Sequence, residues 1–195
     1  MEVMPVKVQP EERHADVSRA VVDIASAHGF DAVTIRALAK ELDSSTTAIT
    51  HYFLTREQLL RRAVSDELSR FEQGRLFAID GLTGFDALRK VVAYTVFDSP
   101  SRPRRFWMRV VIGAQRDPIL RSELTRFNER WDAAIRALLV EEGIADEAID
   151  GIADQLDTVI SGSVMLAFET ESNTVAARRR GLEALVEMII AAAVR

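Results

Sequence analysis

The chain has 195 residues, of which 48% are hydrophobic and 28% are charged, and its formal net charge is −5. This composition is typical of a folded protein and too apolar for a disordered one. The absence of cysteine from the sequence excludes disulfides, thiol catalysis and thiolate metal sites. No window approaches the roughly 18 apolar residues of a membrane-spanning helix, and no signal-peptide pattern opens the chain. We therefore expect a cytoplasmic protein with no membrane partner.

Three short helices are expected at the N-terminal end, after a loose tail over residues 1–9. Pro10 suits the first turn of a helix, and Gly29 suits the left-handed position that follows its last turn. Thr34 is a good N-cap for a second helix of about two turns. A third helix is expected over residues 45–52, after a tight turn. No segment shows the alternation of a β-strand.

Longer helices are expected in the rest of the chain. A capping box opens a fourth helix at Thr55, and two prolines in segment 98–103 separate a fifth helix from a sixth. Asp117, followed by a proline, opens a long seventh helix. The last two helices are expected over about residues 146–168 and 175–194. The fold class is therefore all-α, with about nine helices.

The second and third helices have the pattern of a helix-turn-helix. The third helix shows small hydroxyl residues outward, which suits a recognition helix in the DNA major groove. Serine and threonine hydroxyls pair with phosphates or bases, and an arginine such as Arg36 can contact guanine bidentately. Between residues 34 and 62, five basic residues stand against three acidic ones. This small excess leaves DNA binding open on charge alone.

Three segments between Gly29 and Leu60 make the pattern more specific. They are Gly29-Phe-Asp-Ala-Val-Thr-Ile-Arg-Ala-Leu-Ala-Lys-Glu-Leu42, Ser45-Thr-Thr-Ala-Ile-Thr-His-Tyr-Phe53 and Arg56-Glu-Gln-Leu-Leu60. In this order they resemble the DNA-binding region of TetR-family regulators. The resemblance implies an all-helical homodimer that binds a double-stranded DNA operator and a small-molecule effector. It also implies dimerisation through the last two helices. Most family members are repressors that the effector releases from DNA.

The resemblance assigns DNA contacts to nine positions. Thr34 and Tyr52 match positions that contact phosphates. Arg36 matches a position that reads bases in some members, and Arg56 replaces the family's usual phosphate-binding lysine. The recognition-helix contacts are Ser45, Thr46, Thr47, Thr50 and His51.

Some positions depart from the family pattern. Thr47 stands where many members have glycine, and Thr50 stands where many have tyrosine, so one common DNA contact is in doubt. Leu42-Asp43-Ser44 replaces the usual Ala-Gly-Val. The segment Ile-Thr-His-Tyr-Phe, residues 49–53, resembles the choline-responsive, BetI-like branch of the family.

The expected domains are a DNA-binding domain over residues 1–55 and an effector-binding and dimerisation domain over residues 56–195. Ligand pockets are mostly apolar with a few polar anchors. The candidates to line an effector cavity are Phe97, Phe106, Trp107, Arg109, Phe127, Trp131, Met165 and Phe168. Further polar anchors would be Gln115, Asn128 and Glu169. Core packing is the alternative for each of these residues. A quaternary amine would find cation–π faces on Trp107 and Trp131.

The last two helices contain stretches that are apolar or small on nearly every side, over residues 161–168 and 189–193. Such a helix is covered on more than one face. A second subunit in a symmetric dimer would supply that cover, and burial within a monomer is the alternative.

Two other classes of protein compete with a DNA-binding regulator. An enzyme is disfavoured, because the three histidines form no pair at ligand spacing and no phosphate loop or nucleophile elbow is present. A di-iron bundle needs two Glu-x-x-His motifs, and only His14 ends one. We expect no catalytic residues, no metal site and no cofactor. A helical partner-binding module without DNA function is the other alternative, and steep salt dependence of DNA retention would separate it from a regulator.

Overall fold

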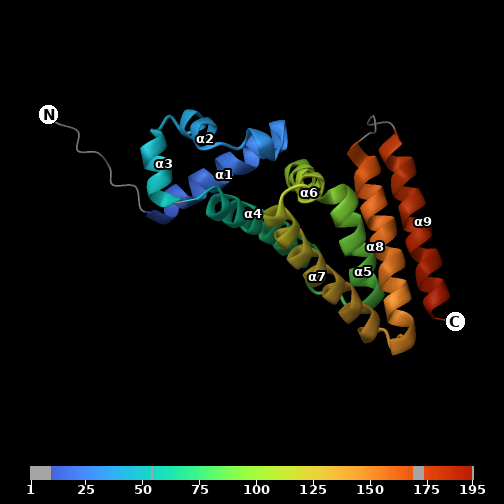
Figure 1. Cartoon of the computed structure of the whole chain (residues 1–195). Coiled ribbons are helices and arrows are strands. Elements are labelled where there is room, and N and C mark those ends of the chain that lie inside the picture. Colours follow the sequence, from blue (N-terminus) through green and yellow to red (C-terminus); the bar gives the residue numbers. More distant parts are fainter. Residues whose placement is uncertain (1–9, 54, 169–173, 195) are drawn as a thin grey trace. The chain divides into compact units, whose positions relative to one another are not determined.

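The computed structural model describes residues 10–53, 55–168 and 174–194, with the backbone alone for residues 10–12 and 167–168. All regular structure in these ranges is helical (Figure 1). The prediction of an all-α fold with about nine helices is confirmed. The expected tail, residues 1–9, lies outside the described residues.

The chain divides by packing into two compact units. The first contains residues up to Leu68 together with Arg109–Leu124, and the second contains Ser69–Met108 and the residues from Thr125 onward. Three helices supply residues to both units: α4 (Arg56–Ala78), α6 (Ser101–Ala114) and α7 (Pro118–Glu141). These bounds describe packing, whereas the division expected at residue 55 concerns function.

Three N-terminal helices belong to the first unit. They are α1 (Pro10–His28), α2 (Ile35–Glu41) and α3 (Thr46–Tyr52), and the 3₁₀ turn η1 (Phe30–Ala32) follows α1. Gly29 ends α1 with a left-handed φ of 85°, which glycine adopts without steric cost. Thr34 and Ser45 cap the next two helices: each side-chain oxygen accepts a backbone N–H three residues later, at 3.1 Å.

The core of the first unit is made by the apolar faces of these helices. Leu38 of α2 and Ile49 of α3 are completely buried, as are Val17 and Val21 of α1. Gly113 belongs to the same unit, and a Cβ there would lie 2.4 Å from Leu120 and 3.3 Å from Phe30. The short helices are therefore held by burial, because an isolated helix of two turns is unstable in water.

The second unit contains the C-terminal helices. Its elements include α5 (Gly84–Ala93), the π-helical turn η2 (Tyr94–Asp98), α8 (Asp146–Phe168) and α9 (Val175–Ala193). α8 and α9 lie side by side (Figure 1), and α5 packs against α9. The core includes the fully buried Leu88, Leu139 and Leu156.

The start of α5 is fixed by the end of α7. The backbone N–H groups of Gly84 and Phe85 donate to the carboxylates of Glu141 and Glu142, at 2.9 and 2.8 Å. These two carboxylates take the place of a side-chain cap, since Thr83 makes no capping hydrogen bond. Free N–H groups at a helix start favour negative charge, so the arrangement stabilises α5.

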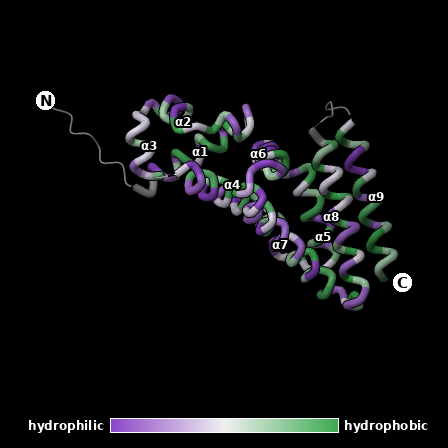
Figure 2. The backbone as a smooth tube through the Cα atoms, viewed as in Figure 1, coloured by the Kyte–Doolittle hydropathy of each residue, from purple (hydrophilic) through white to green (hydrophobic). Residues whose placement is uncertain are grey.

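Apolar residues, green in Figure 2, recur along α8 and α9. Several of them are exposed in the single chain, among them Met165, Leu185 and Met188. Apart from the residues that the structure leaves undescribed, no helix is both long and apolar enough to cross a membrane.

Candidate DNA-binding site and ligand cavity

The exposed face of α2 and α3 carries most of the residues predicted to contact DNA. The exposed members are Thr34, Arg36, Ser45, Thr46, Thr47, Thr50, His51 and Arg56, and Tyr52 is half-buried. Buried Ile49 lies on the opposite side of α3 and fixes the orientation of the helix. The hydroxyl groups of α3 thus point away from the core, as a recognition helix requires.

The turn between α2 and α3 is formed by a residue in an unusual conformation. Asp43 has a φ of 44°, in the left-handed region that asparagine and aspartate tolerate better than most residues. The N–H of Ser44 donates to the carbonyl of Ala39 at 2.8 Å, which closes the end of α2 in a Schellman-type bond. Arg13 of α1 donates to Ser44 Oγ at 3.0 Å. The turn that aims α3 is therefore held from both sides.

Two hydroxyl groups of the site are used inside the protein. Ser45 Oγ accepts the cap bond from Ala48, and Thr50 Oγ1 donates to the carbonyl of Thr47 at 3.1 Å. Thr50 therefore keeps its oxygen lone pairs for a partner and has its proton engaged. Thr46 and Thr47 form no side-chain hydrogen bond with the described residues, so both their donors and their acceptors are available.

The basic residues of this region differ in their partners. Arg56 pairs with Asp117 at 3.0 Å, and Arg62 pairs with Asp66 at 2.9 Å. Arg61 pairs with both Glu57 and Glu123. In contrast, Arg36 and Lys40 of α2 form no ion pair with any described residue. The two uncompensated cations therefore lie on the helix that precedes the recognition helix.

Asp117 links two roles. Its Oδ1 accepts the N–H of Ile119 at 2.9 Å and caps α7, while its Oδ2 pairs with Arg56. Burial alone would raise the pKa of Asp117, but the hydrogen bonds from Arg56 and from the backbone outweigh it and lower the pKa. Sequence analysis identified Asp117 as a helix cap and did not foresee this pair, because the partners are 61 residues apart.

Aromatic contacts hold the end of α3. His14 of α1 packs edge-on against Tyr52 and Phe53, with ring centroids 5.4 and 4.9 Å apart. His51 packs edge-on against Tyr52 at 5.3 Å. The Glu-x-x-His histidine is thus a packing residue of α1. No three His, Asp or Glu side chains gather as a metal site within the described ranges.

A small cavity of about 40 Å³ lies in the second unit. Three predicted residues line it: Trp107, Phe127 and Trp131. Asn128, named among the polar anchors, lines it too. The other lining residues are Phe71, Arg75, Thr95, Asp157, Ile160, Ser161 and Val164, and sequence analysis did not single them out. Thr95 lies in the π-helical turn η2, an irregularity frequent at functional sites.

The remaining candidates of the predicted effector pocket lie elsewhere. Phe106 is completely buried, and Met165 is 46% exposed. Arg109 donates to the backbone carbonyl of Ser26 in the first unit, at 3.4 Å. Phe97 stacks with Arg179 at 4.8 Å. The side chain of Phe168 lies outside the described residues, as does Glu169.

A second cavity of about 210 Å³ shares Arg75, Phe127 and Trp131 with the first. Its other lining residues are mostly aliphatic and come from α4, the turn after it, α5 and α7: Leu76, Ile79, Val91, Ala134, Ile135, Ala137 and Leu138, with Glu72 and Arg130. The two cavities together offer a small space of mixed polar and aromatic lining and a larger, mostly apolar one, with Arg75 lining both, a combination typical of ligand sites.

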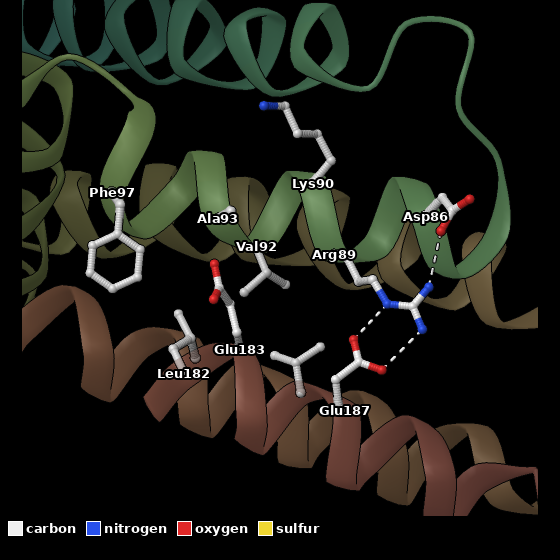
Figure 3. A pocket seen from close by; sticks show the side chains of 10 residues that line it. Asp86, Arg89, Lys90, Val92, Ala93, Phe97, Leu182, Glu183 and Glu187 are labelled. Carbon is white, nitrogen blue, oxygen red and sulfur yellow. Dashed lines mark hydrogen bonds and ion pairs between the residues drawn. The ribbon is translucent and has the colours of Figure 1, made fainter. Parts of the chain in front are cut away.

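Figure 3 shows a separate, open groove of about 450 Å³ between α5 and α9. Arg89 crosses it to pair with both carboxylate oxygens of Glu187, at 2.6 and 3.0 Å, and also pairs with Asp86 at 3.0 Å. The pKa of Arg89 is raised, chiefly by the hydrogen bond to Glu187. The charged groups of this groove therefore already satisfy one another.

The all-helical fold and the exposed, rigidly braced helix-turn-helix define a DNA-binding regulator of transcription. Residues 13–63 match the family described as "Bacterial regulatory proteins, tetR family". Residues 13–63 therefore form a TetR-family DNA-binding domain, and the chain has the fold of transcriptional regulators of that family. No curated protein sequence matches the chain significantly.

Solved structures share the fold at low sequence identity. A transcriptional regulator from Rhodococcus sp. Rha1 is 18% identical, with a TM-score of 0.80 over 92% of this chain and 97% of that one. A Saccharomonospora viridis protein in complex with choline is 17% identical, with a TM-score of 0.78 over 91% and 96% of the two chains. A Mesorhizobium loti protein assigned to the TetR family is 16% identical, with a TM-score of 0.73 over 95% and 98%. At these identities, the likeness shows the fold.

Proposed function

We propose that the protein is a homodimeric repressor that a small-molecule effector releases from its operator DNA. The observation that carries the proposal is the outward hydroxyl face of α3 next to the uncompensated Arg36 and Lys40 of α2. Such a face combines base-reading groups with charges for phosphates. Since regulation requires contact with the bacterial chromosome, the proposed location is the cytoplasm.

In this proposal each exposed residue has a role. Thr46 and Thr47 contact base edges with free hydroxyl groups, and Thr50 accepts a hydrogen bond through its oxygen. Thr34, Ser45, His51 and Tyr52 contact phosphates at the ends of the two helices. Arg36 reads a base. Arg56 reaches a phosphate only if it exchanges or shares its pair with Asp117.

The exposed apolar side chains of α8 and α9 support dimerisation through these two helices. A shallow hollow between these helices is lined by Val159, Leu185, Met188 and Ile189, and Met188 is 67% exposed. Contiguous apolar surface of this kind marks an interface, and a two-fold dimer is the commonest arrangement. Two subunits would place two recognition helices about one turn of DNA apart, roughly 34–36 Å.

Release from DNA is proposed to be a shift between two conformations of the dimer. An effector in the cavities around Arg75 would favour the conformation in which the spacing of the DNA-binding domains no longer fits the operator. The effector acts only to the extent that it binds this conformation more tightly. The proposal assigns no catalytic role to the protein. Stoichiometric binding of a metal ion to the purified protein would support the alternative of an enzyme.

The test uses a duplex that the purified protein selects from a random DNA library. Thr46→Ala and Arg36→Ala are expected to weaken binding to this duplex while the dimer, measured by light scattering, stays intact. Each lost base contact costs about 1–3 kcal/mol per half-site. Asp80→Ala, an exposed substitution in the turn between α4 and α5, is the control. Variants that discriminate the selected duplex as well as the wild type does would contradict the site.

The competing function is a partner-binding module without DNA activity. It predicts that the purified protein selects no sequence from the library and that its retention on DNA lacks steep salt dependence.

A further inference from the structure

Arg75 of α4 is a buried cation that Glu72 and Asp157 attract electrostatically, although no described carboxylate forms an ion pair with it. Its exposed fraction is 7%, and it forms no ion pair with any described residue. Glu72 is the acid with the largest electrostatic effect on Arg75. Its carboxylate accepts hydrogen bonds from Arg130 at 2.9 and 3.1 Å. Since burying an unpaired charge is costly, the presence of Arg75 at this position needs a physical reason.

Aromatic rings hold the guanidinium in place. Its central carbon lies 4.4 Å from the ring centroid of Phe71, 4.9 Å from Phe127 and 4.0 Å from Trp131. The Nε–H donates to Thr95 Oγ1 at 3.1 Å, which in turn donates to the carbonyl of Val91. A guanidinium has five N–H donors, so the four on its terminal nitrogens are without an acceptor among the described residues.

A second donor in the same cavity also lacks a partner. The indole Nε1 of Trp107 is buried and forms no hydrogen bond with any described residue. Buried polar atoms are nearly always paired, so an orphan in a cavity points to a missing partner. Burial raises the pKa of Asp157, the acid of this cavity, and the indole N–H of Trp131 and the charge of Arg75 oppose that rise without an ion pair forming. The groups left without partners are therefore donors.

Burial also acts on Arg75 itself. Desolvation lowers its pKa to about 9, and the side chain still carries its charge at neutral pH. The cavity thus presents a positive charge that a bound anion would stabilise. A planar carboxylate matches the guanidinium edge with two parallel hydrogen bonds.

We propose that the effector is an amphipathic carboxylate whose carboxyl group pairs with Arg75 and whose hydrocarbon body fills the aliphatic cavity between α4, α5 and α7. This inference rests on the proposed release of the regulator by a small molecule. The 40 Å³ cavity has room for little more than the carboxyl group. The 210 Å³ cavity holds about seven groups the size of a water molecule at roughly 30 Å³ each, which suits a chain of that many carbons.

The same geometry argues against a cation as effector. A quaternary amine needs open aromatic faces, but the ring of Trp131 is covered by Arg75 at 4.0 Å. A second cation beside Arg75 would also be repelled. This geometry therefore favours a carboxylate over the quaternary amine that the sequence-based hypothesis places on Trp107 and Trp131.

Calorimetric titration of the full-length wild-type protein tests the proposal. The probes are straight-chain carboxylates of five to nine carbons, with the alcohol and the alkylammonium of the best length, and choline. We expect the carboxylate to bind best. Arg75→Met should weaken it about 10- to 100-fold, as expected for the loss of a charged hydrogen-bonded pair, and should leave the alcohol nearly unaffected. Trp107→Phe should weaken it several-fold.

Arg89→Met is the matched control, since Arg89 also lies in a cavity of this unit but is paired with Glu187. It should bind the carboxylate as the wild type does. Circular dichroism shows whether each variant is folded. Absence of carboxylate binding by the wild type, tighter binding of choline or alkylammonium, or loss of binding in Arg89→Met in place of Arg75→Met would overturn the inference.

Release of the selected duplex is measured separately, which distinguishes the two proposals. Carboxylate binding that depends on Arg75 without DNA release would support the ligand chemistry and contradict the effector role. DNA release by choline alone would support the regulator and overturn the carboxylate.

Discussion

Substitution of Arg36 should change the salt dependence of DNA binding, whereas substitution of Arg62 should not. Both arginines are exposed and belong to the N-terminal unit. They differ in that Arg62 is paired with Asp66 at 2.9 Å, while Arg36 has no acidic partner among the described residues. Arg36→Gln and Arg62→Gln therefore remove the same charge from two different electrostatic environments.

The expected magnitude follows from counterion release. Each DNA phosphate that a protein neutralises contributes about −0.9 to the slope of log K against log salt concentration. A dimer has two copies, so Arg36→Gln should make this slope shallower by about 1.8. When the salt concentration rises from 0.05 to 0.2 M, the affinity of Arg36→Gln for DNA should therefore fall by a factor about 12-fold smaller than that of the wild type.

The assay is fluorescence anisotropy of the selected duplex at four or more salt concentrations, with both variants and the wild type. Arg62→Gln should follow the slope of the wild type, because Asp66 already compensates its charge. Equal changes of slope in the two variants, or none in Arg36→Gln, would refute the assignment of uncompensated charge to α2.

Three other changes have defined outcomes. Asp43→Gly relieves a left-handed backbone conformation that costs about 1–2 kcal/mol for a residue with a Cβ, and glycine adds about 0.5–1 kcal/mol of entropy cost on folding. We therefore expect a small increase in melting temperature, and a decrease would contradict this reasoning. Leu185→Glu with Met188→Glu should give monomers in light scattering while the helical circular dichroism is kept, and an intact dimer would exclude α9 from the interface. The pKa of Asp117 is lowered in the folded state, so its contribution to stability is present above the pKa of the unfolded chain and is lost as pH falls through the lowered value. Arg56→Gln should therefore reduce stability at pH 7 more than at pH 3 in denaturant titrations.

Local structure was predictable because it depends on neighbouring residues. The caps at Thr34 and Thr55 and the left-handed Gly29 each involve hydrogen bonds within a few residues, and each is present. The bounds expected for the last two helices differ from α8 and α9 by no more than one residue. The helix-turn-helix was likewise predicted from the order of the sequence segments between Gly29 and Leu60.

Partners distant in the sequence were not predictable in the same way. In the sequence, Arg75 looks like one more charge on a long, solvated helix, and only packing places it against Phe127 and Trp131 of α7. Arg109 has the right helical phase for a pocket, yet it donates to the carbonyl of Ser26. Helical phase indicates which residues are buried together and leaves open which neighbouring element they face.

The central claim is that the exposed face of α3 lies in the major groove of two operator half-sites. The chain contains no cysteine, so Glu41→Cys, an exposed position at the end of α2 to which no DNA contact is assigned, gives a single attachment point for an iron-based DNA-cleaving reagent next to the turn that leads into α3. The account predicts cleavage of the selected duplex at two positions about one helical turn apart, and none from Ala177→Cys on α9. Uniform cleavage along the duplex, or equal cleavage from both variants, would contradict it.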